Sequence, residues 1–429
     1  MIEILSVENM RKSDEATIAS GIPGTELMMR AARGVFESVA WKAPVAIVCG
    51  SGNNAGDGYA LALCLKEAGI DCDVLCVYDR YSTDGKYYYD KCMDLGVKII
   101  HLQNLNGATD VCPENGSDLS KYSTVVDCLL GTGFKGAVRA DLAEVIERIN
   151  NSGAYIVSVD INSGLNGDTG MSSCCVHSDL TVSVGSYKPG HFLNMAKDVI
   201  KDKVNVDIGI TPQDEPFRLL EEQDIRRVLG IRKNYSNKGT YGYTALIGGS
   251  TRYSGAIRLA YLANAAMRSG AGVVKVALPG ELVHDVAVHI LESTIFPLSS
   301  KTRVMSTKKS GCCETDNGES YDKEVAYNPG EIDELTSNVK TVAFGMGIGT
   351  GDGAADILNH LLTKYTGNLI VDADGLTLLS QIDLNSRVFK PRNLILTPHI
   401  KEFSRLTGLD ISEILEDRSE EHTSELQSL

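Results

Sequence analysis

Residues 48–58 read VCGSGNNAGDG, a glycine-rich turn between an apolar run and a helix-like segment. The apolar run, Val45–Cys49, has the length of a buried strand, and residues 59–68 read as a helix. A strand that enters a helix through a glycine turn binds phosphate on backbone N–H groups. This turn also carries Asn53, Asn54 and Asp57, side chains that a simple phosphate cradle does not need. The strand, glycine turn and helix together predict an α/β fold, and the three polar side chains predict a polar site in it.

The composition argues against several classes of protein. The chain has 429 residues, enough for two or three domains, and a net charge of −15, which disfavours nucleic acid or an anionic membrane as partner. No apolar run reaches the roughly 18 residues of a membrane span, and the charged N-terminus lacks a signal-peptide core. The 11 cysteines form no CxxC pair, so we expect reduced thiols, no zinc site and a cytoplasmic location.

Strand-like and helix-like runs alternate in two blocks, which predicts parallel sheets covered by helices. Two helices are expected within residues 8–40, around a break at 21–24. The expected strands of the first block are Val45–Cys49, Asp73–Tyr78, Val97–Leu102, Thr124–Leu130, Tyr155–Ile161 and Leu180–Val184. Those of the second block are Tyr243–Ile247, Val273–Leu278, Thr341–Phe344, Asn368–Val371 and Asn393–Leu396. Residues 301–325 are polar and are predicted to form an exposed insertion or mobile loop.

Two more polar signatures follow strands of the first block, at residues 127–133 (DCLLGTG) and 160–164 (DINSG). An aspartate at a strand end is often only a helix cap or turn residue. Together with the glycine turn, three strand ends of one parallel sheet carry polar residues. This favours a common ligand crevice, because ligands bind outside the carboxyl ends of the strands.

An NAD-dependent oxidoreductase is an alternative interpretation of the first block. Gly50, Gly52 and Ala55 satisfy the loose dinucleotide fingerprint, and Asp79 follows the next strand, where a ribose-binding acid would lie. Against it, no proton-relay histidine or Tyr-Lys pair is evident. His101 and His191 are isolated in the sequence, and we expect structural roles for both.

The first 210 residues resemble the NAD(P)H-hydrate epimerase family. The resemblance rests on GNNAGDG, VVDCLLGTGFKG, VDINSGLNGDTG and the opening GIPGTELMMRAARG. It implies a Rossmann-like three-layer domain that interconverts R- and S-NADHX or NADPHX, the hydrated forms of the nicotinamide cofactors. Two positions depart from the family pattern: Asn162 stands where a proline is usual, and Met29 where a glutamate is common.

The resemblance also implies roles for individual residues. Asp160 would be the acid/base at the hydroxylated carbon, and Asn54, Asp127 and Ser163 would hold a potassium ion through oxygen ligands, which suit a hard cation. The residues expected to line the substrate are Asn53, Asn54, Ala55, Gly56, Asp57, Gly131, Thr132, Gly133, Phe134, Lys135, Gly136, Ala137 and Asp160. A binding module of the same fold that performs no turnover remains the alternative, and a homo-oligomer is possible.

Residues 238–417 resemble the ribokinase-like NAD(P)H-hydrate dehydratases, which use ADP or ATP with Mg²⁺. The matching segments are KGTYGYTALIGGSTRYSGA, MRSGAGVVKVALP, FGMGIGTG, VDADGLTLL and LTPHIKEFSRL. By resemblance Ala256, Gly347 and His399 would contact the hydrated cofactor. For His399 alone, a loop histidine with a local hydrogen bond is the simpler interpretation.

We expect this second domain to be incomplete and inactive. No segment after residue 406 resembles the family's nucleotide-binding glycine turn with its catalytic aspartate. The expected organisation is an epimerase domain at 1–210, a linker at 211–237, an incomplete ribokinase-like α/β domain at 238–417, and a tail. The tail, Arg418 to Leu429, resembles one reading frame of a sequencing-adapter oligonucleotide and is predicted to be foreign; a polar disordered tail is the alternative.

Overall fold

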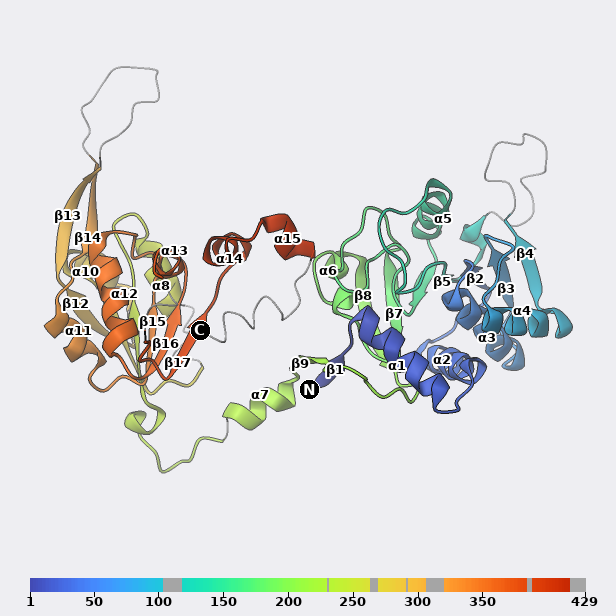
Figure 1. Ribbon diagram of the computed structural model, residues 1–429, viewed down its shortest axis with the longest axis horizontal. Coiled ribbons are helices and arrows are strands. Elements are labelled where there is room, and N and C mark those ends of the chain that lie inside the picture. Colours follow the sequence, from blue (N-terminus) through green and yellow to red (C-terminus); the bar gives the residue numbers. More distant parts are fainter. Residues whose placement is uncertain are drawn as a thin grey trace, which may run out of the picture. The chain divides into compact units, whose positions relative to one another are not determined.

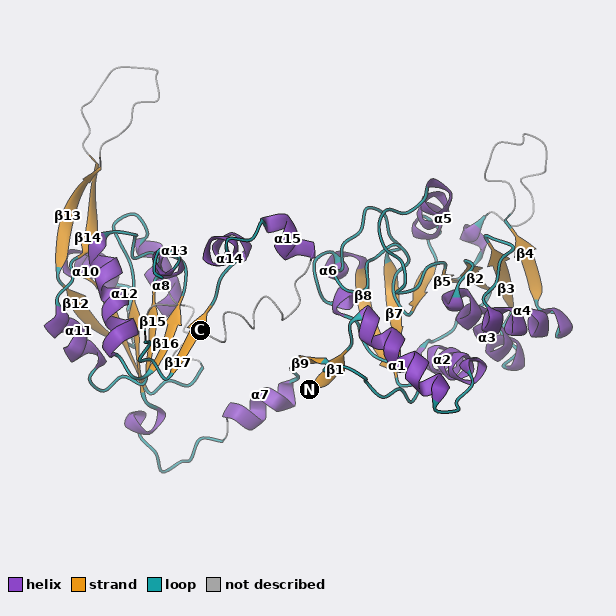
Figure 2. Cartoon of the chain, viewed as in Figure 1, coloured by secondary structure: helices purple, strands orange, loops and turns teal. Residues whose placement is uncertain are grey.

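The computed structural model describes residues 1–102, 118–229, 231–262, 269–290, 292–305, 320–383 and 388–416. The chain forms two compact units, Met1–Gly230 and Ile231–Leu429, and each contains an open parallel sheet with helices on both faces (Figures 1 and 2). The boundary falls within the segment expected to be a linker, 211–237. The predicted α/β class is therefore confirmed for both units.

The sheet of the first unit has seven parallel strands. In spatial order they are β4 (Lys98–His101), β3 (Cys72–Cys76), β2 (Val45–Cys49), β5 (Thr124–Cys128), β6 (Tyr155–Val159), β7 (Ser178–Val184) and β8 (Ile200–Val206). The chain winds outward from β2 in one direction and from β5 in the other, so the strand order reverses between them. The predictions missed β8, because its sequence IKDKVNV is charged and half-exposed, as suits an edge strand.

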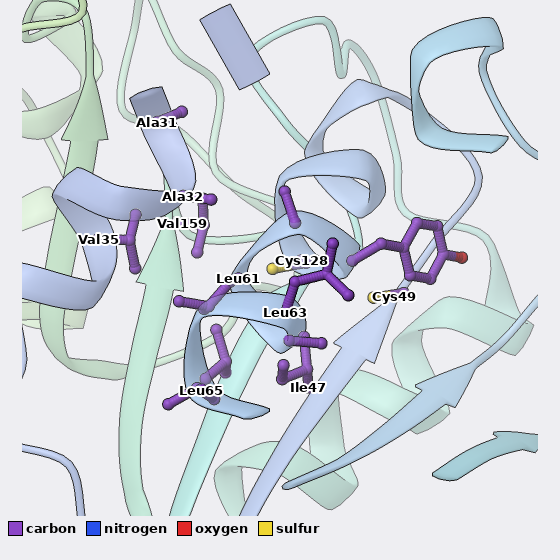
Figure 3. Packing of buried hydrophobic residues seen from close by; sticks show 14 of the residues in the cluster. Ala31, Ala32, Val35, Ile47, Cys49, Leu61, Leu63, Leu65, Cys128 and Val159 are labelled. Carbon is purple, nitrogen blue, oxygen red and sulfur yellow. The ribbon is translucent and has the colours of Figure 1, made fainter. Parts of the chain in front are cut away.

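Helices cover both faces of this sheet because β2 buries alternate side chains on opposite sides. Ile47 and Cys49 face a cluster with α2 (Gly24–Ser38), α3 (Asn53–Glu67) and α4 (Thr83–Asp94), part of which Figure 3 shows. Ala46 and Val48 face α5 (Ala140–Asn150). The remaining elements of the unit are β1 (Ile2–Ile4), α1 (Val7–Ala19), η1 (Leu119–Lys121), η2 (Pro189–His191), α6 (Ala196–Val199), β9 (Phe217–Leu219) and α7 (Glu222–Leu229).

Local sequence explains where the first helices begin. Ser6 caps α1 by accepting a hydrogen bond from Asn9 N, and Pro23 precedes α2, so the predicted break at 21–24 is confirmed. Helix α3 begins earlier than predicted, at Asn53 rather than Tyr59. The NNAGDG segment is therefore the first turns of the helix and not a loop before it.

The second unit has a six-stranded parallel sheet. In spatial order its strands are β12 (Thr294–Leu298), β11 (Val273–Pro279), β10 (Tyr243–Ile247), β15 (Thr341–Phe344), β16 (Asn368–Val371) and β17 (Asn393–Leu396). The strand order reverses between β10 and β15. The helical elements are η3 (Lys238–Tyr241), α8 (Ser254–Leu262), η4 (Gly280–Leu282), α10 (Val283–Ala287), α11 (Pro329–Thr336), α12 (Asp352–Lys364), α13 (Asp374–Leu379), α14 (Ile400–Thr407) and α15 (Ile411–Glu416).

Residues 301–325 were expected to form an exposed insertion or mobile loop, and the loop alternative is wrong at both ends of the segment. Strands β13 (Ser300–Met305) and β14 (Ser320–Val325) pair as an antiparallel hairpin. Lys301 lies opposite Glu324 in the register of this ribbon, whose sequence has no apolar run to predict it. Residues 306–319 and the expected foreign tail lie outside the described ranges.

Within the described ranges, no helix is long and apolar enough to cross a membrane. The eight cysteines in those ranges are free thiols.

Candidate functional site

A cavity of about 530 Å³ opens at the carboxyl edge of the first sheet, beside the reversal of strand order between β2 and β5. Open α/β sheets bind ligands at such a switch point, because the loops after the two strands diverge there. The cavity is lined by residues of α1, α2, the β2–α3 turn, the loop after β5, the end of β6 and the segment after β7. All three polar signatures of the sequence contribute to it.

Asp160 follows β6 and lines this cavity together with Lys188, which follows β7. The Lys188 ammonium donates to Asp160 Oδ1, and also to Val184 O at 2.9 Å. The Lys188 side chain is 1% exposed and that of Asp160 is 16% exposed. Burial by itself would raise the pKa of Asp160, but the charge and hydrogen bond of Lys188 outweigh it and hold that pKa below its ordinary value. The pair therefore places a carboxylate in the cavity wall.

The backbone of Asp160 is held in an unusual conformation. Its φ is 66°, in the left-handed region that aspartate adopts more readily than most residues. Its N–H donates to Val182 O (2.8 Å), and its carbonyl accepts from His191 Nε2 (2.8 Å). Because Lys188 N donates to His191 Nδ1, the proton of the neutral ring lies on Nε2. Burial, followed by the nearby Lys188 charge, lowers the pKa of His191 to about 4, so the ring is a neutral support of the site, as expected.

Two of the three residues expected to hold potassium, Asn54 and Ser163, contact the backbone of Leu130. Asn54 Nδ2 donates to Leu130 O (3.0 Å), and Leu130 N donates to Ser163 Oγ (2.8 Å). Asn54 Oδ1 is buried and has no hydrogen-bond partner among the described residues. A buried oxygen without a donor fits a cation ligand, because an unpaired polar group in the interior is costly.

Asp127 is the exception in this set. Its carboxylate accepts hydrogen bonds from the hydroxyls of Ser158 (2.9 Å) and Ser163 and from the backbone N–H groups of Ser163 (2.9 Å) and Leu129 (3.2 Å). Burial raises its pKa, although these four donors oppose the shift. Asp127 therefore supports Ser163 and the β5 loop directly. No group of three or more His, Cys, Asp or Glu in the described ranges could hold a metal ion.

Three further carboxyl groups line the cavity, those of Asp14, Asp57 and Asp84, and burial shifts the pKa of the first two. Asp57 follows the glycine turn on α3, and Asp14 lies on α1. Burial raises the pKa of Asp57 well above its ordinary value, and the charges of Asp160 and Asp14 add to the shift. Burial likewise raises the pKa of Asp14 to about 6, although Lys188 opposes it. The cavity thus combines one ionised carboxylate with two acids that bind protons more tightly.

The structure divides the expected substrate-lining residues into two groups. Those on the cavity wall are Asn53, Asn54, Asp57, Gly131, Thr132, Gly133, Phe134 and Asp160. A Cβ atom on Gly131 would lie 3.3 Å from Asn54 Cβ and 3.8 Å from Asp160 Oδ2, so this glycine separates the two functional side chains. Ala55 and Gly56 are buried in α3, and Lys135, Gly136 and Ala137 are exposed beyond the cavity.

The two residues that depart from the family pattern, Met29 and Asn162, both lie outside the cavity wall. Met29 does not line the cavity; it faces a separate surface groove between α2, α3 and α4. Asn162 is fully buried, and its Nδ2 donates to Val176 O (2.8 Å), Ser178 Oγ (3.0 Å) and Val199 O (3.1 Å). Its Oδ1 accepts from Thr181. Asn162 therefore ties the loop after β6 to β7 and α6.

Asp79 and His101, which the oxidoreductase alternative brought into question, lie away from the cavity, whereas Gly52 of the dinucleotide fingerprint lines it. Asp79 is exposed and accepts a hydrogen bond from Tyr81 OH (2.7 Å). His101 is also exposed, and its Nε2 lies 3.1 Å from Tyr89 OH. Neither residue belongs to the cavity wall.

In the second unit, the glycine turns after β10 and β15 meet at the strand-order reversal. A Cβ on Gly347 would lie 2.9 Å from Ala256 Cβ, so these two expected contacts are adjacent. His399 instead caps α14: its Nδ1 accepts from the backbone N–H groups of Lys401 (3.1 Å) and Glu402 (3.4 Å). This is the local hydrogen-bonding role proposed as the simpler interpretation.

Reasoning from sequence missed Lys188 and Asp14. Lys188 lies in SYKPG directly after an apolar strand, which was the available signal for a buried lysine at a strand end. Asp14 lies on a helix in a stretch rich in charged residues, and no local pattern separates it from its exposed neighbours.

Two family descriptions match the chain. "YjeF-related protein N-terminus" matches residues 24–190, and "NAD(P)H-hydrate dehydratase" matches residues 244–428. Because the second match continues to residue 428, the expected inactivation of that half by truncation is not confirmed.

Curated relatives match across both units. Proteins named bifunctional NAD(P)H-hydrate repair enzyme Nnr include one from Coxiella burnetii, 30% identical over 95% of this chain and 76% of that protein. Another, from Methanothermobacter thermautotrophicus, is 32% identical over 94% of this chain and 72% of that protein. A solved ADP/ATP-dependent NAD(P)H-hydrate dehydratase from Bacillus subtilis, co-crystallised with ATP and Mg²⁺, is 24% identical over 47% of this chain and 59% of that chain, with a TM-score of 0.34.

Proposed function

The chain belongs to the family of bifunctional NAD(P)H-hydrate repair enzymes, and from that premise we propose that the cavity of its first unit epimerises NADHX and NADPHX. Asp160 is the proposed acid/base at the hydroxylated ring carbon. The observation that carries the proposal is a carboxylate, kept ionised by the buried Lys188, in the wall of a cavity at the switch point of a parallel sheet.

The chemistry of the substrate suits such a carboxylate. Water adds to an enamine so that the hydroxyl joins the carbon next to nitrogen, because the nitrogen lone pair stabilises a positive charge there. Inversion at that carbon requires a proton to be given to one oxygen and taken from another. A positioned carboxyl group contributes about 10²–10⁴-fold to such a step.

We further propose that a potassium ion binds at Asn54 and Ser163. The unpartnered Asn54 Oδ1 supports this assignment, while Asp127 would act by holding Ser163 in place. A bound cation would supply positive charge for the phosphates or the polar ring substituent of the substrate.

The variant that tests Asp160 is Asp160→Asn. Asparagine also tolerates the left-handed backbone and keeps an oxygen that can accept from Lys188. Because the buried ammonium loses its counter-charge, folding of the variant is checked by Trp41 fluorescence. Chiral chromatography of mixed epimers should show a rate reduced by about 10²–10⁴-fold. Asp79→Asn, at another strand end but outside the cavity, is the matched control and should retain the wild-type rate. An unchanged rate in Asp160→Asn would remove this residue from the mechanism.

For the second unit, membership of the family supports binding of ADP or ATP with Mg²⁺ and the hydrated cofactor, with Ala256, Gly347 and His399 as the proposed contacts. We keep the prediction that this chain performs no dehydration. In the structure His399 Nδ1 caps α14, and its Nε2 lies 3.2 Å from Glu402 Oε1. Recovery of NADH absorbance from S-NADHX with ADP or ATP would disprove this prediction without affecting the epimerase proposal.

A further inference from the structure

One stripe of α1 faces the cavity of the first unit. Met10, Asp14 and Ile18 are spaced four residues apart and all line the cavity wall. Residues four apart lie on one face of a helix, so Asp14 is directed into the cavity between two apolar side chains. No described residue donates a hydrogen bond to its carboxyl group.

Helix α1 is anchored firmly enough to position this carboxyl group. Val7 N donates to Asp168 Oδ1 at 2.7 Å, which fixes the beginning of the helix. Asn9 Oδ1 accepts from Asp214 N (3.1 Å), and Ser13 Oγ accepts from Gln213 N (3.1 Å). These contacts come from segments far apart in the sequence, so the position of α1 is set by the fold of the whole unit.

We propose that Asp14 is a second catalytic acid/base of the epimerisation, exchanging protons with the substrate from the α1 wall while Asp160 does so from the end of β6. This inference rests on the proposed epimerase function and adds a residue to it. Inversion of one carbon is served by two proton-exchanging groups on different walls of a site, because the leaving and the entering oxygen lie on opposite faces of the ring.

The two carboxyl groups differ in electrostatic environment. Burial raises the pKa of Asp14 to about 6, and Asp160 and Glu15 add to the shift while Lys188 opposes it. Lys188 holds the pKa of Asp160 below its ordinary value against the effect of burial. Between the two pKa values Asp14 is protonated and Asp160 is ionised, which is the arrangement of an acid and a base in one site. Burial also raises the pKa of Asp57 well above its ordinary value.

Protons and bonding electrons are conserved in the proposed step. Asp14 gives its proton to the substrate hydroxyl as the C–O bond breaks, the bonding pair leaves with the oxygen as water, and the ring nitrogen forms a C=N⁺ bond. A second water adds its oxygen to the other face of the carbon, and Asp160 takes the proton that this water loses. Transfer through solvent returns the proton from Asp160 to Asp14, and the reverse reaction uses the same groups in opposite roles.

The test compares Asp14→Asn with the wild-type chain and with Glu15→Gln, a matched control on the same helix whose side chain is 62% exposed. Asp14→Asn should lower kcat by about 10²–10⁴-fold, whereas Glu15→Gln should retain the wild-type rate. In the wild type, kcat/KM should decline as pH rises above about 6, because Asp14 loses its proton. Asp14→Asn should lose that decline, and Asp14→Glu should recover part of the rate.

Two outcomes are distinguishable. If the wild type does not epimerise the substrate, the proposed function fails and this inference fails with it. If the wild type is active and Asp160→Asn is impaired, but Asp14→Asn keeps both the wild-type kcat and the decline above pH 6, only the role of Asp14 is overturned. A folding defect is excluded by the fluorescence of Trp41, the single tryptophan of the chain, which lies in the first unit.

Discussion

Replacing Lys188 by methionine tests the buried charge pair on which the site depends. Methionine keeps much of the side-chain length but removes the ammonium group that bonds Asp160 and Val184 O. Val184 O also accepts a hydrogen bond from Ser186 N (2.9 Å), so this carbonyl stays paired in the variant. The substitution therefore mainly leaves the Asp160 carboxylate without its counter-charge.

The expected loss follows from the burial of the pair. Removing one partner of a buried ion pair costs about 3–5 kcal/mol of stability. The side chain of Asp160 is 16% exposed toward the cavity, where water partly replaces the ammonium, so we expect the lower end of that range, about 3 kcal/mol.

The loss should depend on pH with a defined sign. In the wild type the pKa of Asp160 is lowered, so its contribution to stability is present above the unfolded-state pKa of about 4 and is lost as pH falls below it. In Lys188→Met burial is the largest remaining influence on Asp160 and raises its pKa, so the unfolded state releases the proton at lower pH than the folded state does. The deficit relative to wild type should therefore be small near pH 4 and grow as pH rises toward 8.

Urea unfolding followed by Trp41 fluorescence measures the free energy of unfolding of the first unit, because the single tryptophan lies in that unit. Lys201→Met is the matched control, since it removes an exposed ion pair with Asp179 (3.5 Å) that contributes at most about 1 kcal/mol. Adding Asp160→Asn to Lys188→Met should restore most of the stability but not the epimerase activity. A pH-independent deficit, or a double variant no more stable than Lys188→Met, would refute the charge-pair explanation.

Three further predictions concern the framework of the site. The wild type should have a higher melting temperature and activity in potassium chloride than in tetramethylammonium chloride. Asn54→Leu removes the unpartnered oxygen, so the variant should behave the same in both salts. Asn162→Ala should lower the free energy of unfolding by about 2–3 kcal/mol in the same urea assay, because it leaves the Val176 and Val199 carbonyls without this donor. A Cβ on Gly50 would lie 2.0 Å from Leu129 O, so Gly50→Ala should cost about 3 kcal/mol, whereas Gly52→Ala, with open space around it, should melt like the wild type; equal melting of the two would contradict this packing.

The sequence by itself determined the fold class and the strands that carry the site. The fully buried parallel strand β2 reads as an uninterrupted apolar run, VAIVC, and glycine and polar residues mark the end where the chain turns. Hydrophobic patterning therefore placed most strands within two residues, and the motifs predicted Asn54, Asp127 and Asp160 as neighbours. It did not predict β8 or the β13–β14 hairpin, because these strands carry charges that resemble loop sequence, and it also missed β1, β9 and β12.

Only the tertiary structure decided which charged groups act on one another. Asp14 and Asp160 are 146 positions apart, and Lys188 is 28 positions beyond Asp160, yet all three line one cavity. Electrostatic interactions depend on distance in space and on exclusion of water, and neither is encoded in local spacing. Helix geometry separates Met29 from the site. Its neighbour Met28 lines the cavity, but one residue of rotation about α2 turns the Met29 side chain to the separate groove.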